Sequence, residues 1–590
     1  MSVRRPLSHH SSLVEVGHFA VAWLVLNVLP LVPAMVTPLP VSPYFPLCVE
    51  VFVIVTLLAF AGGTRAESTV RIGSIVAVVG LLLYQGYDAV VYTAFQRSGI
   101  VYEDVQFIDD LAYFAMGVGS WATVAGILFG GLGFLAVILV VRWCVRAVAT
   151  VGQRAPYRWA VILGHVLVWP IVGVIGPALD WGTPNLTYQA SSEQVRYRTI
   201  TTRAVANARA SLRLESMMDS LDARPVDSTY AAYDTLSLDE PPSVYLFAVE
   251  SYGSVLEEHP DLRGSYRSLM RATDSTLGRR GWDGVTARLD APVRGGRSWL
   301  AIASLLTGVR VDQQLLFNRF QEAPDEVPHL VRFLNEQDYH TIALQPYTFA
   351  RPGLPVRNLY DFDVTLYRDD LEYQGPAYGL ANAPDQYSLN FAHSDVLEEV
   401  SGPFFLFFET VSSHALWNYG LAPFQRDWRS FNGADGVSGP SKALLKRRGG
   451  PPTPFLADSI TAPRIFDQSR PRRYLQHVAY DLHVIREYLK EKAPEGSIAV
   501  ILGDHQPPLF DTQSRLVPLH VLTTDRDVLD RLHRRGFSRG LLPDGDRATL
   551  GQEEFYSLLV DLLAGRTADP DSSRQSLFRP GGASPSLLVP

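Results

Sequence analysis

The stretch Ser497-Ile-Ala-Val-Ile-Leu-Gly-Asp-His-Gln-Pro-Pro508 has the pattern of a buried strand that ends at two metal-ligating side chains. A short apolar run, 498–502, is closed by Gly503, which is typical of a strand covered on both faces. Asp504 and His505 follow at the carboxyl end of this strand, where open α/β sheets bind their ligands. A carboxylate and an imidazole suit Zn²⁺ or Mn²⁺. The alternative is a turn with a solvated aspartate and a surface histidine.

The composition of the chain excludes some classes of function. The chain has 590 residues, a formal net charge of -8 and two cysteines, Cys48 and Cys144. An acidic chain without a basic patch rich in aromatic residues is not expected to bind nucleic acid. Both cysteines lie in apolar runs of the first third, so neither disulfides nor thiolate-bound metal can hold the remainder together.

The first third predicts a membrane domain. Five apolar runs cover residues 17–37, 45–62, 72–95, 118–141 and 158–178. Each run is close to the length of about 20 residues that crosses the core of a bilayer. The runs are apolar all round, whereas helices of a soluble bundle carry a polar stripe. Because four runs follow the first, that first run is not a cleavable signal peptide.

The arginines predict the orientation of this domain. They precede the first run and lie in the links between runs two and three and between runs four and five. The alternate links, 38–44 and 96–117, hold only Arg97. We therefore expect a multi-pass protein of the inner or plasma membrane, with its N-terminus in the cytoplasm and its large C-terminal part outside the cytoplasm.

From residue 241 onward, strands alternate with helices, which predicts an α/β domain with a doubly wound sheet. The expected strands are 244–251, 284–290, 341–346, 404–410, 497–503 and 517–523, and the expected helices are 261–280, 330–335, 474–492 and 552–563. A segment rich in glycine and proline, 420–470, interrupts this pattern and is expected to be a lid or disordered.

The expected domains follow from these patterns. Residues 1–180 form the transmembrane domain, and 181–240 form a juxtamembrane linker with helical spacing over 192–222. Residues 241–565 form the α/β domain, which contains the insertion 420–470. Residues 566–590 form a flexible tail.

Further polar side chains stand beside the expected strands. Glu250 ends the strand 244–251, Ser298 follows Arg294-Gly-Gly-Arg297, and His414 follows the strand 404–410. Each has a structural alternative: an exposed cap for Glu250, a helix N-cap for Ser298, and a loop histidine for His414. Because a doubly wound sheet gathers its site at the strand ends, we expect these residues to join Asp504 and His505.

The order Glu250-Ser251, Ser298, Ser413-His414, Gly503-Asp504-His505 resembles the alkaline phosphatase superfamily. Within it, the chain resembles the sulfatase-like membrane enzymes, namely the lipoteichoic acid synthases and the phosphoethanolamine transferases, which also carry five spans before an external catalytic domain. The segment 298–308 has the length of the sulfatase active-site signature. Leu300 and Ile302 stand where that signature has proline and arginine, which argues against sulfatase chemistry.

This resemblance implies a divalent metal ion, Mn²⁺ or Zn²⁺, held by Glu250, Ser298, Asp504 and His505. It also implies that Ser298 is the nucleophile. His414 and Arg357 take substrate-binding positions in the same comparison, although the residues that flank Arg357 differ from those of the family.

The implied function is transfer of a phospholipid head group, phosphoglycerol or phosphoethanolamine, to a cell-envelope glycan or lipid through a covalent intermediate on Ser298. A serine hydroxyl is a poor nucleophile at neutral pH, and coordination to a metal is one way to activate it. Two alternatives stay open. One is a hydrolase of phosphate or sulfate esters with the same site, and the other is an inactive sensor or scaffold, which predicts no bound metal.

Overall fold

The structure is a computed structural model of the chain. It describes residues 9–36, 48–95, 97–107, 121–153, 159, 163–164, 188–190, 193–195, 200–221, 233, 236–322, 324–327, 329–348, 359–376, 378, 383–415, 417, 420–432, 470–508, 510, 514–542 and 549–565. The chain divides into two compact units, Met1–Met217 and Met218–Pro590.

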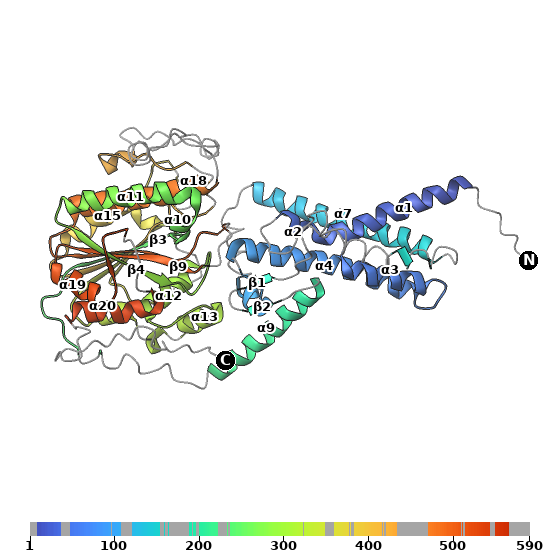
Figure 1. The fold of residues 1–590 in the computed structure, drawn as a ribbon, viewed down its shortest axis with the longest axis horizontal. Helices are drawn as coiled ribbons and strands as arrows, with labels where there is room; N and C mark the ends of the chain where they lie inside the picture. Colours follow the sequence, from blue (N-terminus) through green and yellow to red (C-terminus); the bar gives the residue numbers. More distant parts are fainter. Residues whose placement is uncertain are drawn as a thin grey trace, which may run out of the picture. The chain divides into compact units, whose positions relative to one another are not determined.

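The first unit consists mainly of apolar helices (Figure 1). Its elements are α1 (His9–Val28), η1 (Leu29–Leu31), α2 (Val32–Val36), α3 (Val49–Ala61), α4 (Glu67–Phe95), α5 (Val101–Asp104), η2 (Val105–Phe107), α7 (Trp121–Gly152), β1 (Tyr188–Ala190), β2 (Glu193–Val195) and α9 (Ile200–Leu221). Three helical stretches are long and apolar enough to cross a membrane, by length and composition: Val14–Ala34, Glu67–Phe95 and Leu128–Gly152. They confirm the first, third and fourth predicted runs as long apolar helices.

The other two predicted runs differ in outcome. The second run, 45–62, contains α3, whose 13 residues are fewer than the about 20 that cross a bilayer. The fifth run, 158–178, lies almost wholly outside the described residues. The number of spans and their orientation therefore stay predictions.

Helix α9 lies in the segment 192–222 that the sequence predicts to be helical, and buried polar contacts join it to the rest of the first unit. Arg203 of α9 forms an ion pair with Asp88 of α4 and donates a hydrogen bond to Gln85 Oε1 at 2.9 Å. Asn207 Nδ2 donates to the carbonyl oxygen of Gly99 at 2.6 Å. Because buried charges are stable only when they are paired, these contacts fix the position of α9 along α4.

The second unit is built on a nine-stranded mixed sheet with the order β10-β4-β9-β8-β3-β7-β5-β6, and β11 pairs with β4. The strands are β3 (Val244–Val249), β4 (Asp283–Asp290), β5 (His340–Gln345), β6 (Val364–Tyr367), β7 (Phe404–Glu409), β8 (Ile498–Gly503), β9 (Leu516–Thr523), β10 (Ser538–Arg539) and β11 (Thr549–Gly551). Strands β8, β3, β7, β5 and β6 are parallel to one another. Strand β9 runs antiparallel to both β8 and β4.

Helices cover both faces of this sheet (Figure 1). They are α10 (Val255–Glu258), α11 (Pro260–Gly278), α12 (Ser298–Thr307), α13 (Gln314–Glu322), α14 (Leu330–Asn335), α15 (Asp385–Asp395), α18 (Arg470–Lys492), α19 (Arg526–Arg534) and α20 (Phe555–Leu563). Short 3₁₀ turns are η4 (Pro324–Glu326), η5 (Arg368–Leu371), η6 (Leu397–Glu399), η7 (Trp428–Asn432) and η8 (Gln552–Glu554). The predicted α/β sheet and its strands are confirmed.

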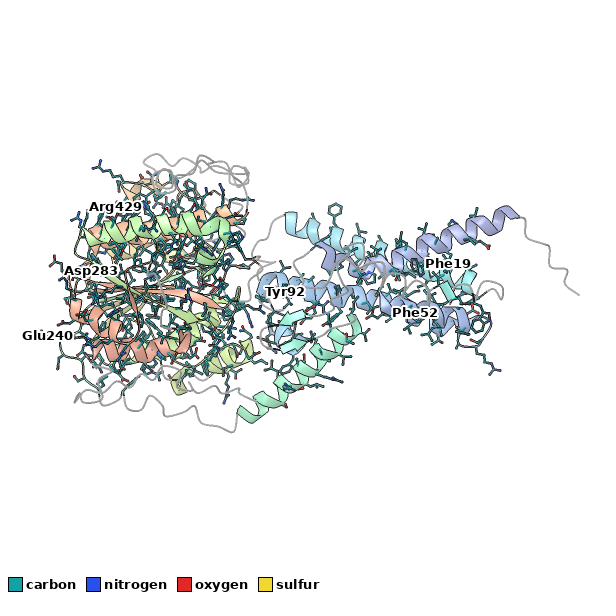
Figure 2. All side chains as sticks on the ribbon, in the orientation of Figure 1. Phe19, Phe52, Tyr92, Glu240, Asp283 and Arg429 are labelled. Atoms are coloured by element: carbon teal, nitrogen blue, oxygen red, sulfur yellow. The ribbon has the colours of Figure 1, made fainter. Side chains whose placement is uncertain are left out.

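The alternation of side chains along β3 explains why both faces are covered. Tyr245 and Phe247 belong to the core that α11, α15 and α18 share, whereas Leu246 and Ala248 belong to the core that α14, α19 and α20 share. Successive strand residues point to opposite faces, so a continuous apolar run needs a cover on each side. Figure 2 shows side chains filling the space between the sheet and both layers of helices.

The predicted insertion is described only in part. Residues 420–432 end in η7, and α18 begins at Arg470. Residues 433–469, and the predicted tail 566–590, lie outside the described residues, so the lid and the tail stay predictions.

A glycine at the end of β8 allows a close approach of two chain segments, and it gives a test of the fold. A Cβ atom at Gly503 would lie 1.9 Å from the carbonyl oxygen of Tyr252. We expect Gly503→Ala to force the ends of β3 and β8 apart and to lower the free energy of unfolding by about 1–3 kcal/mol, as overpacking does. Chemical denaturation of the purified full chain measures this change.

The matched control is Gly264→Ala on α11, where a Cβ atom would meet nothing within 4 Å. Alanine in a helix is favoured over glycine by up to about 1 kcal/mol, so this variant is expected to be neutral or more stable. Equal losses of stability in the two variants would contradict the close approach at Gly503.

Candidate metal centre

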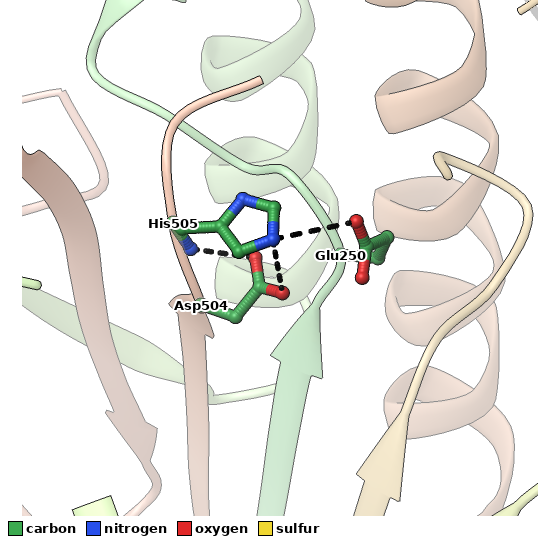
Figure 3. Close-up of side chains that lie close together, drawn as sticks. All are labelled: Glu250, Asp504 and His505. Atoms are coloured by element: carbon green, nitrogen blue, oxygen red, sulfur yellow. Dashed lines mark hydrogen bonds and ion pairs between the residues drawn. The ribbon is translucent and has the colours of Figure 1, made fainter. Parts of the chain in front are cut away.

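Four predicted residues meet at the carboxyl ends of β3 and β8. Glu250 directly follows β3, and Asp504 and His505 directly follow β8. These strands are parallel neighbours in which Val249 pairs with Gly503, so the residues that follow them lie side by side. Ser298 enters as the first residue of α12. Figure 3 shows the side chains of Glu250, Asp504 and His505 converging.

The ligand atoms of these residues lie at distances that fit a small metal ion. Ser298 Oγ donates a hydrogen bond to Glu250 Oε2 at 2.9 Å and lies 3.1 Å from His505 Nε2. His505 Nε2 lies 3.4 Å from Asp504 Oδ2 and 3.7 Å from Glu250 Oε1. Ligands at about 2.1 Å from a tetrahedral Zn²⁺ are about 3.4 Å from one another. The four side chains therefore surround a space of the right size for such an ion.

His505 presents a free lone pair to this space. Its Nδ1 lies 2.8 Å from the carbonyl oxygen of Gln506. A carbonyl oxygen can only accept, so Nδ1 carries the proton and Nε2 does not. Burial lowers the pKa of His505 more than the negative charge of Glu250 raises it, so the ring is neutral at pH 7.

Asp504 has one satisfied and one unsatisfied oxygen. Oδ1 accepts hydrogen bonds from the backbone N–H groups of Ser251 at 2.7 Å and His505 at 2.6 Å. Oδ2 is buried and accepts no hydrogen bond from any described residue. Burial and the charge of Glu250 raise the pKa of Asp504 well above its ordinary value. An unpaired buried carboxylate oxygen is costly, and a bound cation would remove that cost.

Glu250 is a buried carboxylate with donors on both oxygens. Ser251 Oγ donates to Oε1 at 2.7 Å, and Ser298 Oγ donates to Oε2. Burial raises the pKa of Glu250, but the charge of His414 and these two hydrogen bonds outweigh it, so the pKa lies below its ordinary value. Glu250 is thus ionised at neutral pH. The residues present fit a divalent metal ion.

The structure decides between the alternatives for single residues. Ser298 is not the N-cap of α12, because Arg297 takes that position in a left-handed conformation with φ 61°. Glu250 is not an exposed cap, because only 5% of it is accessible. His414 directly follows Ser413, whose Oγ donates a hydrogen bond to the carbonyl oxygen of Glu250 at 2.6 Å, so the loop that carries His414 is bonded to the centre. Arg357 lies outside the described residues, and its substrate-binding position stays a prediction.

Sequence reasoning missed a third acid at this edge of the sheet. Glu409 is the last residue of β7, is 1% exposed, and accepts a hydrogen bond from Tyr347 Oη at 2.8 Å. Burial and the charges of Glu250 and Asp504 raise the pKa of Glu409 well above its ordinary value. The signal in the sequence was a single acid at the end of the apolar run 404–408.

Comparison with solved structures finds enzymes of the kinds that the order of site residues resembles. No family model and no curated protein matches the chain. The lipoteichoic acid synthase LtaP from Listeria monocytogenes is 13% identical; the match covers 59% of this chain and 79% of that chain, with a TM-score of 0.36. The integral membrane lipooligosaccharide phosphoethanolamine transferase A from Neisseria meningitidis is 11% identical; the match covers 96% of this chain and 97% of that chain, with a TM-score of 0.45.

The phosphoglycerol transferase GacH from Streptococcus pyogenes, solved with sn-glycerol-1-phosphate, is 12% identical, and the match covers 62% of this chain and 88% of that chain with a TM-score of 0.31. Because these TM-scores are below 0.5, the matches do not indicate the activity of this chain. The activity is therefore inferred from the residues of the site.

The convergence of ligand atoms predicts tight binding of a divalent metal. We expect the purified full chain to bind one or more equivalents of Zn²⁺ or Mn²⁺. At a free metal concentration 100-fold above the dissociation constant, the metal is expected to raise the free energy of unfolding by about 2.7 kcal/mol. Elemental analysis measures the metal content, and denaturation with and without a chelator measures the stabilisation.

Asp504→Asn should lower the metal affinity by about 100-fold or more, because it removes the ligand charge at the unsatisfied oxygen. Asp369→Asn is the matched control, since Asp369 is exposed and follows the edge strand β6. Equal metal content in the two variants would rule out Asp504 as a ligand.

Proposed function

We propose that this chain is a metal-dependent, membrane-anchored phosphotransferase that moves a phospholipid head group, phosphoglycerol or phosphoethanolamine, to a cell-envelope glycan or lipid. The observation that carries the proposal is the position of Ser298 Oγ. It lies within hydrogen-bonding distance of an ionised Glu250 and a neutral His505, beside the unpaired oxygen of Asp504. The long apolar helices of the first unit support access to a lipid substrate.

Glu250, Ser298, Asp504 and His505 would hold the metal ion. When bound, a divalent metal supplies Lewis-acid chemistry: it lowers the pKa of a coordinated hydroxyl and draws charge from a phosphoryl oxygen. The protein contributes a nucleophile that is already oriented, because Ser298 Oγ is fixed between two acceptors on different strands.

The first step forms a bond between Ser298 Oγ and the phosphorus of the head group. The hydroxyl proton leaves along the existing hydrogen bond to Glu250 Oε2. The bond from phosphorus to the glycerol oxygen of the lipid breaks, and that oxygen takes up the proton that Glu250 received, which gives diacylglycerol and restores the carboxylate. The head group then remains on Ser298 as a phosphodiester.

In the second step an acceptor hydroxyl attacks the phosphorus of this diester. A bond forms from the acceptor oxygen to phosphorus, the bond to Ser298 Oγ breaks, and the proton of the acceptor restores the serine hydroxyl. The net reaction exchanges one phosphodiester for another and needs no further reactant.

Arg297 and His414 support binding of the phosphate. Arg297 directly precedes Ser298, and its charge acts on His505. His414 acts on Glu250 from the loop after β7. Ser298 also stands at the amino end of α12, where the helix dipole favours an anion. Together these groups offset the charge of the transferred phosphoryl group.

Release of diacylglycerol tests this function. The full chain is placed in vesicles that contain labelled phosphatidylglycerol or phosphatidylethanolamine, and diacylglycerol and the labelled products are followed. We expect release from one of the two lipids, with the label passing to Ser298 and then to an envelope acceptor. Ser298→Ala should lower the rate by about 10³-fold or more, since the nucleophile is lost.

Ser268→Ala on α11 is the matched control and should keep full activity, because the hydroxyl of the half-buried Ser268 donates to the carbonyl oxygen of Gly264 on the same helix. Label that appears only as free glycerophosphate or phosphoethanolamine would identify a hydrolase instead. An Ser298→Ala variant as active as the wild type would overturn the assignment of the nucleophile.

A further inference from the structure

Two buried aspartates outside the metal centre hold the loop 410–414. Asp385, the first residue of α15, accepts hydrogen bonds from the backbone N–H groups of Val411 at 3.1 Å and Ser412 at 2.7 Å. Asp481 of α18 accepts a hydrogen bond from Thr410 Oγ1 at 3.0 Å. Both carboxyl groups are 0% exposed. The loop that leads to His414 is therefore anchored to two helices by acids.

The same loop is bonded to the metal centre. The backbone N–H of Glu250 donates to Thr410 Oγ1 at 3.2 Å, and Ser413 Oγ donates to the carbonyl oxygen of Glu250 at 2.6 Å. A continuous chain of hydrogen bonds thus runs from the carboxyl of Asp481 through Thr410 Oγ1 to the backbone N–H of Glu250. A shift of the loop would move Glu250 and His414 together.

The pair of aspartates needs one hydrogen-bond donor more than the surrounding groups supply. Asp481 Oδ1 is buried and has no hydrogen-bond donor among the described residues. Asp481 accepts a hydrogen bond from Thr410, and its carboxyl also interacts with that of Asp385, which holds the next two residues of the same loop. Two ionised carboxylates offer acceptors only, and two like charges that share a buried site do not both persist. A single proton between the two groups supplies the donor and removes one charge.

We propose that Asp385 and Asp481 share one proton at neutral pH, and that this protonated pair positions the loop 410–414, and through it Glu250 and His414, for the reaction proposed above. The effect of the pair on catalysis rests on the proposed phosphotransferase function, whereas the sharing of the proton does not. Both aspartates are positioning residues, because neither touches the ligand atoms of the metal centre.

The electrostatics of the pair agree with this geometry. Burial and the charge of Asp385 raise the pKa of Asp481 well above its ordinary value. Burial also raises the pKa of Asp385, although its hydrogen bonds from Asp481, Ser412 and Val411 oppose that effect.

Other titratable groups surround the pair. Tyr480 lies on α18, and both carboxyls disfavour its ionisation. His477 of α18 lies 2.6 Å from the carbonyl oxygen of Ser412. Glu250, which follows β3, is bonded to Thr410 through its backbone N–H, and His414 ends the loop.

The sign of the pH dependence follows from the direction of the shift. A carboxyl whose pKa is raised in the folded state binds more protons there than in the unfolded chain. The stability that the pair contributes therefore falls as pH rises from the unfolded value of about 3.9 towards the folded value. Once the proton leaves, the two charges repel each other and the anchor of the loop is lost.

Asp481→Asn tests the shared proton directly, because an amide carries a permanent hydrogen in place of the shared one. The infrared spectrum of the wild-type full chain at pH 7 should contain the C=O stretch of a protonated carboxyl that Asp481→Asn lacks. Asp385→Asn should lose the same band, since one proton serves both groups, and the exposed Asp369→Asn should keep it. Identical carbonyl bands in the wild type and both variants would overturn the proposal.

Metal affinity at varied pH tests the positioning role without reference to transfer. Wild-type affinity for Zn²⁺ should fall on the alkaline side as the pair ionises, whereas Asp481→Asn should keep its affinity there. Asp481→Ala should lose about 10-fold at pH 7, in the range seen for outer residues that orient a ligand. Asp385→Asn replaces Asp481→Asn if the latter does not fold.

The outcomes separate the two proposals. An alkaline loss of affinity that is the same in wild type and Asp481→Asn would refute the positioning role. If the infrared and metal results are as expected but no lipid releases diacylglycerol, the shared proton is supported and the proposed phosphotransferase function is refuted.

Discussion

Negative charge held away from water is the constraint on which the edge of the sheet that carries the candidate site depends. Glu250 and Asp504 follow neighbouring parallel strands, and Glu409 ends the next strand along. Each of these acids is almost completely buried. Isolated buried carboxylates are unstable, so the surrounding structure must supply donors, a proton or a cation to each of them. The hydrogen-bonding network around the sheet edge is arranged to meet this requirement.

The requirement is met differently at each acid. Glu250 is kept ionised by hydroxyl donors and a nearby imidazole. Glu409 accepts a hydrogen bond from Tyr347, and the raised pKa of Glu409 keeps this carboxyl neutral. Asp504 is satisfied on one oxygen only, which leaves a position for a cation. The environments thus push the three acids towards different protonation states, a pattern that is common where acid, base and metal chemistry coexist.

The extent to which sequence predicted this arrangement depended on the range of the signal. Runs such as 244–249 and 498–502 carry the strand signal within a few residues, and the glycine, aspartate and histidine that follow are contiguous. The strands β6, β10 and β11 are too short to show a period, and the antiparallel course of β9 depends on a connection that leaves no local pattern. The helix α15 was missed because its polar residues, among them Asp385, are buried by contacts with a distant loop.

The site residues followed the same rule. Glu250, Ser298, Asp504 and His505 were found because the end of an expected strand or a glycine turn marks each of them. Glu409 and Asp481 were not assigned a role, because an acid inside an apolar strand or on an amphipathic helix has no local feature that separates a buried partner from a solvated one. Only the folded chain shows that Thr410 connects Asp481 to Glu250.

The two candidate ligands that follow β8, Asp504 and His505, are oriented by main-chain atoms. His505 Nδ1 lies against the carbonyl of the next residue, and Asp504 Oδ1 accepts from two backbone N–H groups. Their orientation is therefore encoded in the path of the chain and not in the identity of neighbouring side chains. Substitutions at the residues around this edge can then accumulate without displacing Asp504 and His505, which leaves the surrounding surface free to diverge around an unchanged pair.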